Sequence, residues 1–187
     1  MRVISGLFRG KRLIQPEDLI TRPLKDLTKE SIFNILTHSK KYSIDFSSSE
    51  ILDLFAGVGS FGIECMSRGA KHVTFVEKYK PVLKILKNNI SHLKSIKNYE
   101  IIEADILNDL FFESLKKKYN LIFIDPPFKE RNTNFIIENI FKSKILKFNG
   151  TIVIHRHLKE SLILPENFKV LEEKNYGKSK ISFGKFS

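Results

Sequence analysis

The sequence has a single cysteine, no long apolar run and no leader-like start, and each absence narrows the class of protein. Cys65 is the only thiol in 187 residues, so the chain cannot form an internal disulfide. No apolar stretch approaches the roughly 18 residues that a membrane-spanning helix needs. Basic residues interrupt the first twelve positions before the apolar core of a signal peptide could form. We therefore expect a soluble, cytoplasmic protein that makes no membrane contact.

Acidic residues are scarce at the two ends of the chain, and this places the positive charge unevenly. The formal net charge is +11, of which residues 1–42 carry +5 and residues 142–187 carry +6, while residues 43–141 are neutral. Basic surfaces of this kind bind phosphate backbones. A general bias toward lysine is the alternative explanation, but it would spread the charge evenly. The distribution therefore favours a polyanionic partner.

The first 42 residues are predicted to form a basic N-terminal arm. Apolar and polar residues alternate over 3–5 and over 11–15, and Gly6 and Gly10 separate the two runs. This pattern predicts a β-hairpin that exposes a face bearing arginines.

Residues 43–187 are predicted to form the catalytic core of a single domain. Predicted strands cover 51–55, 73–77, 101–103, 121–124, 151–154, 169–172 and 180–186. Predicted helices of the core cover 61–68, 81–93, 109–117 and 134–145. One further helix is predicted in the arm, over 27–36, with Asp26 or Thr28 as its N-cap. Strands that are apolar on both faces and alternate with helices indicate a parallel sheet between two helical layers. We therefore predict a doubly wound, mostly parallel, seven-stranded α/β fold, with the hairpin and first helix as an added arm.

A glycine loop follows the first predicted strand of the core. Gly57, Gly59 and Gly62 fit the pattern G-x-G-x-x-G, in which the missing side chains let the backbone turn tightly against a ligand. Glu77 ends the second strand, 20 residues after Gly57, where a carboxylate can bind ribose hydroxyls. Together they indicate a nucleoside-containing cofactor. The alternative is that the glycines only allow a helix to pack on a strand.

The charge beside this loop distinguishes between cofactors. Asp53 lies just ahead of the glycines and would repel a pyrophosphate bound at the helix N-terminus. A carboxylate there suits a cationic ligand, and S-adenosylmethionine offers both a sulfonium and an amino group. Asp105 follows the third strand and could accept a hydrogen bond from the adenine amine, or it could cap the next helix. The sequence favours S-adenosylmethionine over NAD.

The fourth strand ends in the stiff sequence Asp125-Pro126-Pro127-Phe128. If Asp125 and the Pro126 carbonyl accept hydrogen bonds from an exocyclic amine, they hold its nitrogen facing the methyl donor, and proximity accelerates transfer. Phe128 can stack on the nucleobase. The alternative is a proline-rich turn that merely closes a strand.

Two other chemistries lack the residues they need. Methylation of a pyrimidine ring carbon usually requires a cysteine nucleophile, but Cys65 lies in the helix after the glycine loop, where a small buried side chain is expected. The five histidines show no paired spacing with acids or cysteines. His155 and His157 share one face of a strand, which is too little for a zinc site. We expect no metal.

These residues resemble a known family. Asp53-x-Phe55-x-Gly57-x-Gly59 with Asp125-Pro126-Pro127-Phe128 is similar to the S-adenosylmethionine-dependent amino-methyltransferases. Three further segments resemble the RsmD family of bacterial 16S ribosomal RNA guanine-N2 methyltransferases, and together they extend the likeness over essentially the whole chain. They are residues 2–10 (RVISG…RG), residues 21–36 (TRP…KESIFNIL) and residues 176–183 (YGKSKISF).

The resemblance implies methyl transfer to the N2 amine of a guanine in small-subunit ribosomal RNA. The substrate would be that RNA or the 30S subunit, and no obligate protein partner is expected. The cofactor-binding residues it implies are Asp53, Phe55, Gly57, Gly59, Glu77 and Asp105. Residues Asp125 through Phe128 would hold the target base. The RNA-binding residues are expected among Arg2, Arg9, Lys11, Arg12, Arg22 and Lys178. The chain departs from the family at Leu27, where an arginine is usual, and at Lys178, where an acid is common.

Three alternatives stay open at this point. Asp-Pro-Pro-aromatic sequences also serve DNA adenine and cytosine amino-methyltransferases, although those usually carry a larger recognition domain than this arm. Protein-glutamine methyltransferases resemble the chain too, with Asn in the place of Asp125. A non-catalytic RNA-binding assembly factor could retain the fold without turnover.

Overall fold

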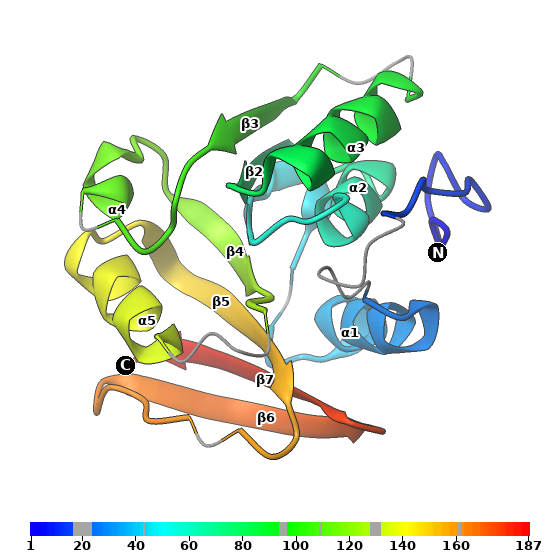
Figure 1. The fold of residues 1–187 in the computed structure, drawn as a ribbon. Coiled ribbons are helices and arrows are strands. Elements are labelled where there is room, and N and C mark those ends of the chain that lie inside the picture. The colour runs from blue at the N-terminus through cyan, green and yellow to red at the C-terminus, as the bar shows by residue number, and fades with distance from the viewer. Residues whose placement is uncertain (17–23, 43, 94–96, 109, 128–131, 161) are drawn as a thin grey trace.

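Seven strands form one sheet, in the spatial order β3-β2-β1-β4-β5-β7-β6 (Figure 1). The structure is a computed structural model that describes residues 1–187 except 17–23, 43, 94–96, 109, 128–131 and 161. The strands are β1 (Glu50–Leu54), β2 (His72–Glu77), β3 (Tyr99–Glu103), β4 (Tyr119–Ile124), β5 (Leu146–His157), β6 (Phe168–Tyr176) and β7 (Ser179–Phe186). Pairs from β3 to β5 are parallel, and β7 runs antiparallel to β5 and β6. The predicted doubly wound, mostly parallel sheet is confirmed.

Helices cover both faces of the sheet (Figure 1). On one face lie α1 (Asp26–His38), α2 (Ser60–Ser67) and α3 (Lys80–Ser91), and on the other α4 (Phe111–Ser114) and α5 (Thr133–Lys142). A 3-10 helix, η1 (Phe46–Ser48), precedes β1. Successive side chains of a strand point to opposite faces, so Ile51 packs under α1–α3 and Leu52 under α4 and α5. Within the described part of the chain, no helix is long and apolar enough to cross a membrane.

Three elements differ clearly in length from the prediction. The strand predicted over 169–172 extends over Phe168–Tyr176, because β7 pairs with it along that whole length. The helix predicted over 109–117 is only the four-residue α4, because the chain becomes extended at Leu115 as it turns back toward β4. Good helix formers in the lysine run that follows made the sequence pattern look longer than the helix. The strand predicted over 151–154 extends instead over Leu146–His157, because β7 pairs with it as far as His157.

The predicted N-cap of the first helix is wrong. Lys25 occupies the N-cap, and its side chain makes no capping hydrogen bond. Asp26 lies in the first helical turn, where its carboxylate accepts a hydrogen bond from the Arg2 backbone N–H at 3.2 Å. Asp26, which was predicted as a possible N-cap, instead joins the start of the chain to α1 through this hydrogen bond. Its negative charge still lies at the positive end of the helix dipole.

The N-terminal segment forms a short antiparallel pair rather than two long strands. A single bridge joins Arg2 and Arg12. Backbone hydrogen bonds flank it, from Val3 N–H to the Lys11 carbonyl at 2.9 Å and from Leu13 N–H to the Met1 carbonyl at 3.1 Å. The side chains of Val3 and Leu13 are buried in the core cluster under α1–α3. The hairpin is therefore held by its packing on the core more than by its own pairing.

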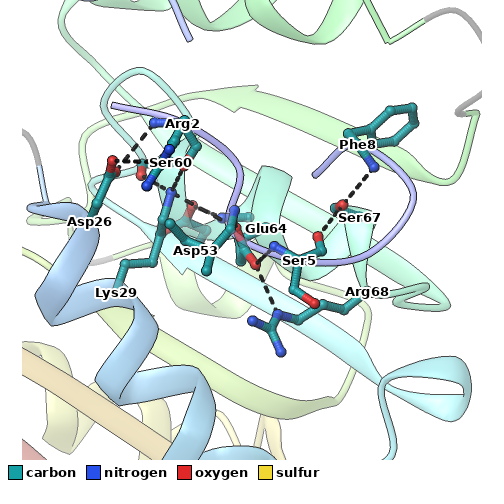
Figure 2. A network of polar contacts seen from close by, with 12 residues as sticks. Arg2, Ser5, Phe8, Asp26, Lys29, Asp53, Ser60, Glu64, Ser67 and Arg68 are labelled. Carbon is teal, nitrogen blue, oxygen red and sulfur yellow. Dashed lines mark hydrogen bonds and ion pairs between the residues drawn. The ribbon is translucent and has the colours of Figure 1, made fainter. Parts of the chain in front are cut away.

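A buried carboxylate fastens this hairpin to α2 (Figure 2). Glu64 accepts hydrogen bonds from the backbone N–H groups of Ile4 at 2.7 Å and Ser5 at 3.0 Å. It also accepts one from Arg68 Nε at 2.9 Å, and its side chain is completely buried. Three donors around one carboxylate offset the cost of removing its charge from water.

Lys29 joins α1 to the same network (Figure 2). Its ammonium is completely buried and lies 3.9 Å from a Glu64 oxygen. It donates to the Arg2 carbonyl at 2.7 Å and to Ser60 Oγ at 3.2 Å, at the start of α2. Burial lowers the pKa of Lys29, while the nearby carboxylates of Glu64 and Asp26 oppose that shift. The hairpin, α1 and α2 thus share one charged centre.

Replacing Glu64 with alanine should destabilise the fold by about 3–5 kcal/mol, because it leaves the Lys29 ammonium buried without its carboxylate and two arm N–H groups without their acceptor. Urea unfolding followed by circular dichroism measures this difference. Glu138→Ala is the matched control, since it breaks only an exposed pair with Lys142 on α5 and should change stability by less than about 0.5 kcal/mol. Equal effects of the two substitutions would contradict the anchoring role.

Candidate functional site

The candidate site lies where β1, β2 and β4 end side by side. Parallel strands bring their carboxyl ends to one edge of the sheet. Leu54 of β1 pairs with Val76 of β2 and with Ile124 of β4, and Asp125 N–H lies 3.4 Å from the Leu54 carbonyl. The glycine loop, the acid that ends β2 and the Asp-Pro-Pro sequence therefore leave the sheet together.

The glycine loop turns tightly directly after β1. Phe55 has a φ of 60°, Gly57 of 56° and Gly59 of 85°, all in the left-handed region. A non-glycine residue in that conformation is uncommon, and such backbone strain gathers at functional sites. Ala56 N–H donates to the Val76 carbonyl at 3.0 Å, and Gly59 N–H to the Ala56 carbonyl at 2.8 Å. The first bond joins the loop to β2, and the second closes the turn of the loop.

The three glycines have different reasons to be glycine. A Cβ on Gly62 would come within 2.2 Å of the Phe75 ring, and one on Gly59 within 2.4 Å of Leu86. At both positions, glycine lets α2 pack closely on its neighbours. This agrees with the alternative explanation of the motif, in which the glycines serve helix packing and not a ligand. Among the described residues, a Cβ on Gly57 would meet only the Phe55 carbonyl, at 3.9 Å, and would otherwise enter open space. Gly57 is the position where the backbone leaves room for a ligand.

Glu77 is held in place by backbone donors at the end of β2. One carboxylate oxygen accepts from Gly57 N–H at 2.8 Å. The other accepts from the N–H groups of Lys78 at 2.9 Å and Tyr79 at 2.8 Å. The acid and the glycine that the sequence paired are thus in direct contact, which sets the distance between the loop and β2.

Asp53 lies beneath the glycine loop, and its side chain accepts a hydrogen bond from Gly62 N–H at 2.9 Å. The residue is only 1% exposed. Burial raises the pKa of Asp53 well above its usual range; the Gly62 hydrogen bond opposes this, while the carboxylates of Asp125 and Glu77 raise it further. Three acids therefore act on one small region, which disfavours a pyrophosphate and suits a cationic ligand.

Asp105 lies in the turn after β3 and does not cap α4, whose N-cap is Leu110. Its carboxylate accepts from Leu107 N–H at 3.1 Å and from Lys78 Nζ at 3.1 Å. Partial burial raises its pKa, but the hydrogen bonds from Leu107 and Lys78 and the lysine charge outweigh this, so the pKa of Asp105 is lowered. Lys78, which the sequence did not single out, thus joins the turn after β2 to the turn after β3.

The Asp-Pro-Pro segment begins directly after β4. Pro126 is buried, Pro127 is exposed, and Asp125 is partly buried with its carboxylate 2.8 Å from His155 Nδ1. Phe128 lies outside the described residues, so its predicted stacking stays a prediction. The contact with His155 was missed, because nothing in the sequence pairs residues 30 positions apart until β4 and β5 are known to be neighbours.

The predicted RNA-binding residues occupy two places. Arg2, Arg9, Lys11 and Arg12 are all exposed on the N-terminal hairpin, and Lys11 also donates to the His92 carbonyl at the end of α3. Lys178 is exposed in the turn between β6 and β7. That turn lies beside the end of β5, because Ser179 pairs with His157. Arg22 falls outside the described residues.

Cys65 is completely buried in α2, which confirms the expectation of a small buried side chain. Burial raises the pKa of its thiol well above the usual range, so the thiolate that a ring-carbon methylation needs is disfavoured. Among the residues that the structure describes, no three His, Cys, Asp or Glu side chains are grouped to hold a metal ion.

The sheet order and the architecture at its carboxyl edge are those of the Rossmann-like methyltransferases. A structure from Escherichia coli, described as "Putative methyltransferase yhhF", superimposes with a TM-score of 0.81 at 26% identity, covering 98% of this chain and 96% of the other. A structure from Haemophilus influenzae, described as "putative methylase HI0767", superimposes with a TM-score of 0.76 at 34% identity over 98% and 96% of the two chains.

Sequence comparison gives the family. The family model described as "Conserved hypothetical protein 95" matches residues 1–185. Ribosomal RNA small subunit methyltransferase D of Haemophilus influenzae is 36% identical over 178 residues, which are 95% of this chain and 89% of that protein. The chain belongs to this family, the RsmD family, as the motifs of the arm and the core indicate.

Substitution of Gly57 and of Gly59 by alanine should have separable effects. Gly59→Ala should lower stability by about 2–4 kcal/mol, because its Cβ collides with Leu86 and its φ is strained. Gly57→Ala should cost only about 1–2 kcal/mol for its left-handed φ but abolish binding of S-adenosylhomocysteine. Thermal unfolding and calorimetric titration measure the two quantities. Unchanged binding by Gly57→Ala would mean that the open space beside the loop is not the cofactor site.

Proposed function

We propose that the protein transfers a methyl group from S-adenosylmethionine to the exocyclic N2 amine of a guanine in small-subunit ribosomal RNA. The observation that carries the proposal is the position of Asp125. It leaves the sheet beside β1, next to the glycine loop, and its carboxylate acts electrostatically on Asp53. A base-binding carboxylate and a cofactor loop so placed can bring an amine and a methyl donor together. The names of the relatives supply the ribosomal RNA substrate class.

The residues at the glycine loop fit the proposed cofactor. Open space faces Gly57, and the Glu77 carboxylate beside it suits ribose hydroxyls. Asp105 at the next strand end suits the adenine amine. Asp53 holds the loop from beneath through Gly62. The carboxylates of Asp125 and Glu77 raise the pKa of the buried Asp53, and a sulfonium or ammonium group bound beside the three acids would offset that repulsion. When bound, S-adenosylmethionine supplies a methyl group activated by the positive sulfur.

The chain's own part in the reaction is to orient the amine. The lone pair of an exocyclic amine is delocalised into the base, so the amine is a poor nucleophile. Asp125 and the Pro126 carbonyl accept its two N–H groups and aim the nitrogen at the methyl donor. Phe128 stacks on the base. Because Pro126 and Pro127 restrict the backbone, these acceptors are fixed before the base arrives, and proximity lowers the barrier.

The proposed reaction is tested by asking whether the protein methylates small ribosomal subunits whose RNA bases carry no methyl groups. Incubation with labelled S-adenosylmethionine, followed by digestion and mass mapping of nucleosides, should place the label on guanine N2. Asp125→Ala should lose turnover by about a hundredfold or more while RNA affinity stays within a few-fold, because it removes the proposed amine acceptor and leaves the exposed basic residues of the hairpin unchanged. Label on adenine, on duplex DNA or on protein would overturn the substrate assignment. Full activity of the variant would remove Asp125 from the mechanism.

RNA affinity should depend on the charges of the hairpin. Replacing Arg9, Lys11 and Arg12 with alanine should weaken RNA binding and reduce the slope of log affinity against log salt by about 0.7–0.9 for each lost phosphate contact. Filter binding at several salt concentrations measures the slope.

The charge-matched control removes three exposed lysines, Lys116, Lys118 and Lys169. They lie just before β4 and at the start of β6, at the opposite edge of the sheet from the candidate site. This control should leave the slope nearly unchanged. If both triple variants lose the same slope, only net charge matters and the hairpin is not a specific RNA contact.

A further inference from the structure

A histidine on β5 is clamped between the Asp-Pro-Pro segment and β7. His155 Nδ1 lies 2.8 Å from Asp125 Oδ1, and its Nε2 lies 2.9 Å from Ser179 Oγ. The histidine side chain is only 4% exposed, whereas the Asp125 side chain is 20% exposed. The buried ring thus approaches the carboxylate from the core, and the carboxylate keeps an accessible side.

The sheet explains why these three residues meet. Phe123, Val153 and Ile181 all face the α1–α3 side of β4, β5 and β7. Side chains two residues along a strand return to the same face, so Asp125, His155 and Ser179 all lie on this face. Asp125 follows the pair of Ile124 with Ile154 and lies beside His155, whereas Ser179 pairs with His157 and reaches His155 diagonally. The antiparallel β7 brings Ser179 to this edge from its own beginning.

The chemistry of the groups fixes the direction of the hydrogen bonds. An ionised carboxylate has only acceptor atoms, so the proton between Asp125 and His155 belongs to Nδ1. In the neutral ring, Nε2 then accepts from the Ser179 hydroxyl, and that hydroxyl selects the tautomer with hydrogen on Nδ1. His155 engages Oδ1 from the buried side, and within the described part of the chain Oδ2 is the oxygen that a ligand can reach.

From this geometry we infer that His155 is a positioning residue, which sets the rotation of the Asp125 carboxylate so that one oxygen receives the target amine. The inference rests on the proposed function. An amine that must present its lone pair along one direction is sensitive to small displacements of its acceptor. Ser179 supports the ring from the far side. The role goes beyond the Asp-Pro-Pro-Phe sequence, since it comes from β5 and β7.

The test compares substitutions that differ in where they place a donor. His155→Asn keeps an N–H close to the position of Nδ1, whereas His155→Gln carries the same amide one bond farther, and His155→Leu has similar bulk without a donor. We expect kcat to fall about ten- to hundredfold for Leu and Gln and to stay within about fivefold of the parent for Asn. KM for both substrates should change less than about threefold in all three variants.

Each result supports or overturns the inference. Equal kcat losses for Asn and Gln, or raised KM and lowered thermal stability in parallel with kcat, would show a merely structural histidine. Retention of parental kcat by the Gln variant would also overturn it, even if the Leu variant fails to fold. His38→Asn, an exposed histidine at the end of α1, is the control and should match the parent. A parent protein inactive on every substrate would instead reject the proposed function.

Discussion

The hydrogen bonds and the ion pair of the buried Glu64 carboxylate hold the N-terminal hairpin, α1 and α2 together. It binds two backbone N–H groups of the N-terminal hairpin and Arg68, and Lys29 places a second buried charge beside it. Each charge would be costly in the core alone, so this pair stabilises the docking of the hairpin and α1 on α2. Because Lys29 also reaches Ser60 at the start of α2, the basic surface of the hairpin is fixed relative to the glycine loop.

The candidate site combines rigid backbone with concentrated negative charge. Strand ends, left-handed residues and prolines fix its outline, while the repulsion among Asp53, Glu77 and Asp125 raises the pKa of Asp53 and would be offset by a cation. The molecular surface has the opposite character, since the chain carries a net charge of +11 concentrated toward its ends. The two fields suit two ligands, a cationic cofactor in the interior and a polyanion outside. Their separation keeps phosphates away from the acids that hold the loop.

Much of the fold was predictable because the patterns involved are local. Apolar strands such as 121–124 and helices such as 61–68 were placed to within a few residues, since burial on both faces leaves a clear signature. The motif spacing associated Gly57 with Glu77, and the structure adds that the two are in direct contact. The partners of Asp26, Glu64 and Asp125 were not foreseen, because each depends on which distant elements become neighbours. The different duties of Gly57 and Gly62 likewise appear only when the surrounding side chains are known.

The place of β7 in the sheet has a consequence for how the protein folds. This strand lies between β5 and β6, and its first residue, Ser179, contacts the histidine that touches Asp125. The parallel strands can pair with one another without β7, but His155 would then lack the Ser179 hydroxyl. The surroundings of Asp125 are therefore complete only when the antiparallel side of the sheet has docked, which couples the two halves of the sheet at this one point.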